Sequence, residues 1–362
     1  MRVFLGIHEV CNITSTYAKA FRALGYETLT VVAKRNRYYP DSQYDVVLGE
    51  RGQFWQRLFR WIPLAWKAIS TCDLFIFTYV ALTPSLIELP LLKWLGKHVV
   101  IVFWGSDVRY IDAFEKQMQS MGVLDEYEPF IRGVRTLGEE SLRVKLNRVR
   151  MAEKYADLIL SQPGYAQLQT RPYMRANIPL DMSMFQYNVP GRKRPLILHA
   201  PSNPLIKGTD FIKRTMDELQ SEGVEFDFQP VENMPNPELR KLLTSADIVV
   251  DELYADTVGV LSTEGMATGN AVLTHYPADF AGVPKDCPAV NITEKNLKDI
   301  LRNVILDVAW RCDLAERGRK FVETNNDSIK IVSDLLSYLE QGQTFRYDFY
   351  PDFHQKALIK GR

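Results

Sequence analysis

Residues 196–230 decide the fold and read LILHAPSNPLIKGTDFIKRTMDELQSEGVEFDFQP. The apolar run 196–200 predicts a buried strand, the stretch 208–222 has the spacing of a helix, and 225–229 predicts a second strand. This order is typical of a parallel sheet with helical crossovers. Because ligands of such sheets bind at the carboxyl ends of the strands, the loop that follows the first strand is a candidate ligand site.

The same alternation of strands and helices runs along the rest of the chain. Strands are expected at 3–7, 27–33, 73–78, 99–103, 157–161, 248–250 and 271–275. Helices are expected at 15–24, 139–155, 237–245 and 261–268. The sequence therefore predicts an α/β fold of two tandem Rossmann-like domains that face a central cleft.

The stretch 190–195, PGRKRP, has the composition of a linker between domains. At about 150 residues per domain, 362 residues also suggest two domains. We expect an acceptor-binding domain at 1–189 and a donor-binding domain at 190–340. The aromatic and basic tail, 341–362, is expected to pack back on the first domain.

Charge and cysteine content exclude several classes of protein. The chain has 44 Lys and Arg against 44 Asp and Glu, which argues against a protein that coats nucleic acid. Four cysteines lie far apart, at 11, 72, 287 and 312, so neither a zinc ribbon nor a disulfide framework is indicated. With no secretory signal and no apolar run of membrane-spanning length, a cytoplasmic protein is expected.

The loop 201–208 lies between an expected strand and helix, so backbone N–H groups face an anion there. Lys207 adds a point charge suited to a diphosphate. Taken alone, the pair Lys207-Gly208 is common, and an exposed lysine at a helix start is the simpler interpretation. No P-loop spacing is present, and no GxGxxG follows the first strand, which argues against bound nicotinamide or flavin.

A second loop and helix junction follows the expected strand 248–250. Residues 256–272 read DTVGVLSTEGMATGNAV. Gly259 lets the backbone approach a phosphate closely, and Gly269 is placed to end the helix. Glu264, as an ionised acceptor, suits the two hydroxyls of a ribose.

This junction resembles the acidic-x7-Glu motif of GT-B glycosyltransferases, especially the family-4-like group that uses nucleotide-activated sugars. The resemblance implies that Asp256, which stands where Glu is usual, contacts the donor sugar. It implies that Gly259 and Val260 lie beside the diphosphate and that Glu264 holds the ribose. A nucleotide-diphosphate sugar is then the donor substrate, with a UDP-sugar favoured, and no cofactor is expected.

Lys207 and Gly208 match the phosphate-binding Lys-Gly of the same family. The family often has an arginine five residues before this lysine, and Ser202 stands there instead. Ser202 and Asn203 are expected to supply neutral hydrogen bonds in its place. Because 232–235 replaces a longer loop near the base, the nucleotide base stays open.

The first half supplies fewer candidates. His8 and Asn12 follow the first strand, where the family places a loop that contacts donor and acceptor. The segment 102–109 is similar to the family's Gly-x-Asp segment. Asp107 is a candidate to orient an acceptor hydroxyl or to act as general base, and the alternative is an N-cap or an ion pair with Arg109.

The resemblance also implies a retaining reaction without a metal ion. No DxD motif is apparent, and charge would build on the leaving diphosphate. Lys207 and the backbone amides at the helix start near Gly259 would stabilise that charge. Asp107, Lys207 and Asp256 are therefore the expected catalytic residues.

The segment 51–67 has four basic residues, no acid and three tryptophans. Such a stretch suits an anionic membrane surface and would bring the enzyme to a lipid-linked acceptor. The alternative is that Leu58, Trp61, Ile62 and Ala65 face the core, because they sit at helical spacing.

The sequence thus predicts a glycosyltransferase that moves a sugar to a saccharide or lipid-linked hydroxyl, as in polysaccharide biosynthesis. Nucleic acid is not an expected partner. Two alternatives stay open. One is another GT-B activity, such as a nucleotide-sugar epimerase, and the other is a catalytically weak nucleotide-sugar-binding protein.

Overall fold

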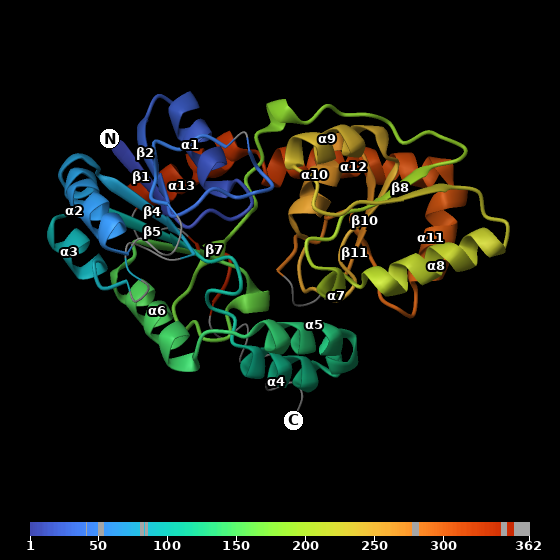
Figure 1. Ribbon diagram of the computed structural model, residues 1–362, viewed down its shortest axis with the longest axis horizontal. Helices are drawn as coiled ribbons and strands as arrows, with labels where there is room; N and C mark the ends of the chain where they lie inside the picture. Colours follow the sequence, from blue (N-terminus) through green and yellow to red (C-terminus); the bar gives the residue numbers. More distant parts are fainter. Residues whose placement is uncertain are drawn as a thin grey trace. The chain divides into compact units, whose positions relative to one another are not determined.

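A computed structural model describes residues 1–40, 42–49, 54–79, 83, 86–276, 282–341 and 346–350, the stretch 54–60 by its backbone only. The chain divides into two compact units (Figure 1). Unit 1 comprises Met1–Phe114, Glu139–Pro179 and Ser328–Arg362, and unit 2 comprises Glu115–Gly138 and Leu180–Asp327.

In the described part of unit 1, seven parallel strands form one sheet in the order β3-β2-β1-β4-β5-β6-β7. They are β1 (Arg2–Ile7), β2 (Glu27–Val32), β3 (Val46–Val47), β4 (Leu74–Thr78), β5 (His98–Val102), β6 (Leu158–Ser161) and β7 (Met174–Arg175). The strands are apolar on both faces, as expected of a parallel sheet covered by helices. Strand order reverses between β1 and β4, which is where open α/β sheets bind ligands.

Helices cover both faces of this sheet (Figure 1). They are α1 (Ile13–Ala23), α2 (Phe54–Thr71), α3 (Leu89–Trp94), α6 (Leu142–Tyr155) and α13 (Ser328–Gln341), with the short 3-10 helix η1 (Pro163–Tyr165). Side chains of α2, α3 and α6 share one core with Phe75 and Phe77 of β4. Side chains of α1 and α13 share the other core with Leu74 and Ile76.

Unit 2 contains a second parallel sheet, with the order β12-β11-β10-β8-β9 among the described residues. Its strands are β8 (Leu196–His199), β9 (Asp227–Pro230), β10 (Ile248–Val250), β11 (Ala271–Thr274) and β12 (Val290–Asn291). Its helices are α7 (Pro204–Lys207), α8 (Thr209–Ser221), α9 (Asn236–Ser245), α10 (Val260–Thr268), α11 (Leu297–Leu306) and α12 (Val308–Asn325), with the 3-10 helix η2 (Met182–Met184). Helix α4 (Ile111–Met121) crosses the boundary between the units, and α5 (Leu124–Leu137) belongs to unit 2.

The α/β fold with two parallel sheets is confirmed. The units are interleaved along the chain, whereas the expected ranges 1–189 and 190–340 are contiguous. Helix α5 packs on α7 in unit 2, and α13 packs on α1 in unit 1. Hydrophobic spacing predicts which face of a helix is buried but not which sheet covers it.

The described part of the expected tail joins unit 1. Phe349 and Tyr173 exchange two backbone hydrogen bonds of 3.1 Å, and their rings lie 5.3 Å apart. Residues 351–362 lie outside the described part of the chain.

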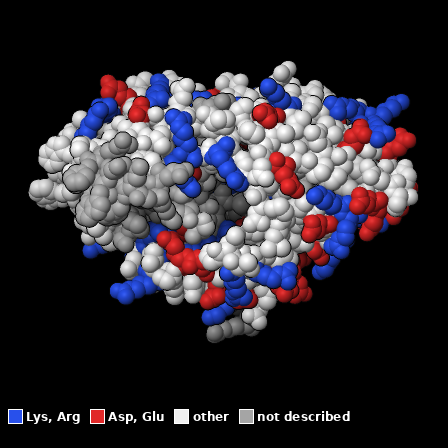
Figure 2. Space-filling model, in the orientation of Figure 1, with Lys and Arg blue, Asp and Glu red and all other residues white. Residues whose placement is uncertain are grey.

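None of the described helices combines the length and the apolar character that a bilayer span requires. Basic and acidic side chains are interspersed over the face in Figure 2, in keeping with their equal numbers.

Candidate functional site

In unit 2 the carboxyl ends of β11, β10 and β8 lie side by side, because these strands are neighbours in a parallel sheet. The loop 200–203 and α7 follow β8, and the loop 251–259 follows β10. Both loops carry residues for which the sequence predicts donor binding. His275 follows β11 directly.

Lys207 is buried and lies between two carboxylates. Its Nζ contacts Oδ1 of Asp251 and lies 3.2 Å from Oε1 of Glu252. Burial alone would lower the pKa of Lys207, but the two carboxylates outweigh it and raise that pKa above its ordinary value. Burial raises the pKa of Glu252 to about 7, partly offset by Lys207. The simpler interpretation of Lys207, an exposed lysine at the start of a helix, is therefore wrong, because Lys207 is buried at the end of α7.

The backbone around α7 explains how Lys207 reaches this place. Asn203 Oδ1 accepts hydrogen bonds from the backbone N–H groups of Leu205 (3.1 Å) and Ile206 (3.3 Å), so its side chain caps the helix. Gly208 ends α7 with φ of +72°, and a Cβ there would lie 2.8 Å from Cβ of Leu253. Ser202, the other predicted neutral donor, is exposed.

Asp251 joins Lys207 to the start of α10. Its Oδ2 accepts hydrogen bonds from the backbone N–H (3.1 Å) and the hydroxyl (2.7 Å) of Ser262. Gly259 and Val260 stand at the N-terminus of α10, and a Cβ at Gly259 would lie 3.1 Å from Oε1 of Glu252. Gly259 therefore lies at the start of α10, directly beside the carboxyl groups of Asp251 and Glu252.

Glu264 lies in the middle of α10 and is buried, as is its partner Asn236 at the start of α9. The amide nitrogen of Asn236 donates to both carboxylate oxygens of Glu264, at 2.9 and 3.0 Å. Both oxygens are thereby fixed in one orientation. The sequence could not place Asn236 here, because 28 positions separate the two residues.

Asp256 is buried, and its loop is attached to His275. The Nδ1 of His275 lies 2.7 Å from the carbonyl oxygen of Ala255, and its Nε2 lies 3.6 Å from Oε2 of Glu126 on α5. The ring of Tyr127, also on α5, lies 4.9 Å from the His275 ring. Burial lowers the pKa of His275, so the ring favours its neutral form. A segment from the first half of the chain thus braces the loop that carries Asp256.

In unit 1 the carboxyl ends of β1, β4 and β5 bring together neutral groups. The rings of His8 and Tyr79 stack at 4.4 Å, and the Tyr79 hydroxyl lies 3.0 Å from Oγ of Ser106. Tyr79 has φ of +73°, an unusual value for a bulky residue, which is typical of functional sites. Asn12, the other early candidate, accepts a hydrogen bond of 2.5 Å from the hydroxyl of Ser42.

Asp107 is fully buried in unit 1. Its Oδ1 accepts from the backbone N–H groups of Trp104 (3.2 Å) and Gly105 (2.8 Å). Burial raises the pKa of Asp107 to about 7. Both donors precede Asp107, whereas an N-cap accepts from residues that follow it, so the carboxyl holds the preceding turn and is not a helix N-cap.

Two further findings concern the described residues only. No group of three or more His, Cys, Asp or Glu side chains among them is arranged to hold a metal ion.

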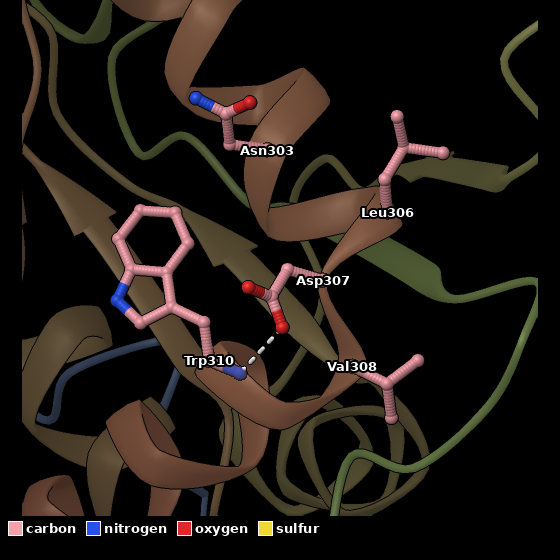
Figure 3. A pocket seen from close by; sticks show the side chains of 5 residues that line it. All are labelled: Asn303, Leu306, Asp307, Val308 and Trp310. Carbon is pink, nitrogen blue, oxygen red and sulfur yellow. Dashed lines mark hydrogen bonds between the residues drawn. The ribbon is translucent and has the colours of Figure 1, made fainter.

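A shallow pocket between α11 and α12 is lined by Asn303, Leu306, Asp307, Val308 and Trp310 and contains none of the predicted site residues (Figure 3). The acidic group of Asp307 caps α12 through the backbone N–H of Trp310, at 2.9 Å.

The pair Asp251 and Glu252 is a sequence signal for this site that the motifs above do not contain. Two acids directly after a buried strand stand at the edge where ligands bind. Tyr79 and His275 likewise follow their strands directly.

No family model matches the chain, and no curated protein matches it. Solved structures match nearly its whole length. Sucrose-phosphate synthase from Thermosynechococcus elongatus is 13% identical over 94% of this chain and 98% of that chain, with a TM-score of 0.63. An alpha-glucosyltransferase in complex with UDP-glucose and DNA containing an abasic site is 13% identical over 93% and 99%, with a TM-score of 0.59. A putative UDP-N-acetylglucosamine 2-epimerase from Listeria monocytogenes is 12% identical over 95% and 99%, with a TM-score of 0.55.

At this level of identity the likeness concerns the fold. The chain has two parallel sheets, and the solved glycosyltransferase structures match it over nearly its full length. The chain has the GT-B fold of glycosyltransferases.

Proposed function

We propose that this protein is a glycosyltransferase that transfers a sugar from a nucleotide-diphosphate sugar to a saccharide or lipid-linked hydroxyl. The observation that carries the proposal is the grouping in unit 2 of Lys207, the start of α10 and the Asn236–Glu264 pair around the carboxyl ends of neighbouring strands. The match to a glucosyltransferase solved with UDP-glucose supports a UDP-sugar as donor.

In this proposal Glu264 binds the ribose hydroxyls and Asp256 contacts the donor sugar. The diphosphate lies at the start of α10, where Gly259 and Val260 present backbone N–H groups. With Glu252 protonated, Lys207 and Asp251 form a neutral pair, so the group does not repel an incoming diphosphate. Preorganised donors then stabilise the charge on the leaving diphosphate, and the transfer is retaining and independent of metal.

The acceptor belongs to unit 1 in this proposal. His8, Tyr79 and Ser106 offer an aromatic face and a hydroxyl at the switch point of the sheet, which suits a sugar ring better than a charged group. Asp107 holds the turn beneath Ser106 and acts by positioning it.

Thermal stabilisation by UDP-, GDP-, ADP- and CMP-compounds in the presence of EDTA tests the donor site. We expect a shift with one nucleotide diphosphate, lost in Glu264→Gln and retained in the matched surface variant Lys213→Ala. Slow hydrolysis of the matching nucleotide sugar is expected as well. No shift with any of the four, or turnover that EDTA abolishes, would contradict the proposal.

The likeness to a putative epimerase favours one second candidate, a nucleotide-sugar epimerase. The two activities differ in what they do without an acceptor. An epimerase converts the nucleotide sugar to its epimer, whereas a transferase hydrolyses it slowly to free sugar. Nuclear magnetic resonance of the incubated donor separates these products, and a pure binding protein yields neither.

A further inference from the structure

Two helices of unit 1 expose large apolar side chains on their outer faces. On α2, Ile62 is 58% exposed and Trp66 is 74% exposed. On α3, Leu91 is 44% exposed and Trp94 is 81% exposed, with Leu95 (40%) directly after the helix. We call these five residues the α2–α3 surface. Two tryptophans this exposed are unusual on a protein without a binding partner, so this surface is a candidate interaction site.

Both outer faces point away from the same side of the sheet. Trp61, Leu64 and Ala68 of α2 pack in the core that also contains Leu89 and Leu92 of α3. Ile62 and Trp66 are four residues apart, and Leu91, Trp94 and Leu95 are spaced by three and four, so each set forms one stripe. A surface helix that needs only a core contact has a polar outer face, whereas the described outer faces of α2 and α3 also carry these large apolar side chains.

The sequences of α2 and α3 are basic, although Asp73 follows α2 and Glu88 precedes α3. Residues 54–71 and 89–97 contain no Asp or Glu, in a chain that otherwise has equal numbers of acids and bases. The basic residues of these two stretches are Arg57, Arg60, Lys67, Lys93 and Lys97. Lys67 is exposed, and Lys93 forms an ion pair of 2.6 Å with Asp157. Exposed Lys67 next to Trp66, in stretches without acids, is complementary to an anionic surface.

We propose that the α2–α3 surface docks on an anionic lipid bilayer, with α2 and α3 lying in the plane of the interface. Trp66 and Trp94 occupy the headgroup region, where indole rings place an apolar body and a polar N–H together. Aliphatic side chains enter the acyl boundary, and Lys67 contacts lipid phosphates. The sequence suggested the segment 51–67, but residues 51–53 and the side chains of 54–60 lie outside the described part of the chain, and the surface extends to α3.

This proposal is independent of the donor site, and vesicle binding without nucleotide tests it. The probes are vesicles of phosphatidylcholine alone and of phosphatidylcholine with phosphatidylglycerol. We expect the full chain to float with the anionic vesicles at low salt and to bind about tenfold less to neutral ones. Trp66→Glu with Trp94→Glu should reduce binding to the anionic vesicles at least about tenfold. Leu306→Glu, which changes an exposed leucine of unit 2 in the same way, should leave it unchanged.

Lipids brominated on their acyl chains give a second readout. They should quench tryptophan fluorescence of the wild-type chain, and less so that of the Trp66→Ala, Trp94→Ala variant. Equal flotation of the wild-type chain and the double glutamate variant would overturn the proposal. A dimer in size-exclusion chromatography that the double variant abolishes, without vesicle binding, would also overturn it and identify a second copy as the occupant.

Discussion

The buried carboxyl groups at the two sheet ends are stabilised in different ways. In unit 2 Asp251 and Glu252 face the ammonium group of Lys207, and Glu264 faces the side-chain amide of Asn236. Asp251 also accepts from the backbone N–H of Ser262. In unit 1 Asp107 accepts backbone hydrogen bonds from its own turn, and Glu9 accepts one of 3.3 Å from Thr14 at the start of α1.

Some of these carboxyl groups have side-chain partners that can move, and others are bound to backbone N–H groups that cannot. A side chain such as Lys207 or Asn236 can share its donor with an incoming ligand without disturbing the backbone. A carboxyl that satisfies backbone N–H groups cannot turn away, because it would leave those groups buried and unpaired. Asp107 and Asp251 are therefore both tied to the backbone, and unit 2 differs in that the ammonium group of Lys207 and the amide of Asn236 also face its carboxyl groups.

The largest expected effect that tests this comparison comes from Lys207→Ala. Without the ammonium group, Asp251 and Glu252 are buried without their cation, and we expect a loss of about 3–5 kcal/mol in the free energy of unfolding. Urea denaturation measures it. In unit 1, Asp107→Asn keeps an oxygen for Trp104 and Gly105, so it should cost less than Lys207→Ala.

Two control variants decide whether charge is the reason. Lys213→Ala removes an exposed lysine whose partner Glu232 is 4.0 Å away, so it should cost less than about 1 kcal/mol. The triple variant Lys207→Met, Asp251→Asn, Glu252→Gln should recover most of the stability that Lys207→Ala loses. A cost for Lys207→Ala no larger than that of Lys213→Ala would contradict the buried cluster.

Sequence patterns predicted the architecture because each strand is a short apolar run followed by a turn. They also placed Lys207, Gly259 and Glu264 near one end of the second sheet, since these stand at fixed distances from a strand or within one helix, and their roles in donor binding stay a prediction. They could not find Asn236 or the contact of Glu126 with His275, which join distant segments. They could not show either that the carboxyl of Asp107 is buried against its own backbone, and its catalytic role stays a prediction.

A smaller effect, on ligand affinity, is expected from Asn236→Asp. This variant tests whether the side-chain partner of Glu264 in unit 2 matters for binding. The change puts a second carboxyl 2.9 Å from Glu264, so the pair shares a proton and its acceptor geometry is lost. Under the proposed function, affinity for UDP should fall about tenfold, or roughly 1.4 kcal/mol. The preference for UDP over 2′-deoxy-UDP should shrink with it, which calorimetry of both ligands measures.

The control for that experiment is Asn303→Asp, which adds the same charge at an exposed position on α11 of unit 2, away from the predicted site residues. It should leave both affinities unchanged. If wild-type protein binds UDP and Asn236→Asp keeps the full preference for the ribose 2′-hydroxyl, Asn236 does not position Glu264 for the ribose. If wild-type protein binds no UDP, the proposed donor site itself is wrong.

The smallest expected effect is the change in the free energy of unfolding per pH unit. One buried carboxyl in each unit contributes to it, so the two units can be compared directly. Burial raises the pKa of Asp107 in unit 1 and of Glu252 in unit 2 to about 7, above ordinary values of 3.8 and 4.5. The folded chain then binds protons that the unfolded chain has released, so the free energy of unfolding falls as pH rises from the ordinary values to about 7. Each group contributes a slope of at most about 1.4 kcal/mol per pH unit in that window.

Asp107→Asn should remove one such slope while keeping the hydrogen bonds to Trp104 and Gly105, because the amide oxygen replaces the carboxyl oxygen. Glu252→Gln should remove a slope in unit 2, and in a Lys207→Ala background it should raise stability at pH 7, since Glu252 without its cation has to take up a proton on burial and Gln does not. Urea denaturation at a series of pH values between about 5 and 8 measures both. A wild-type slope that neither substitution reduces would mean that both carboxyls are ionised in the fold, and the contrast between backbone-held and side-chain-paired carboxyls would then lose its electrostatic basis.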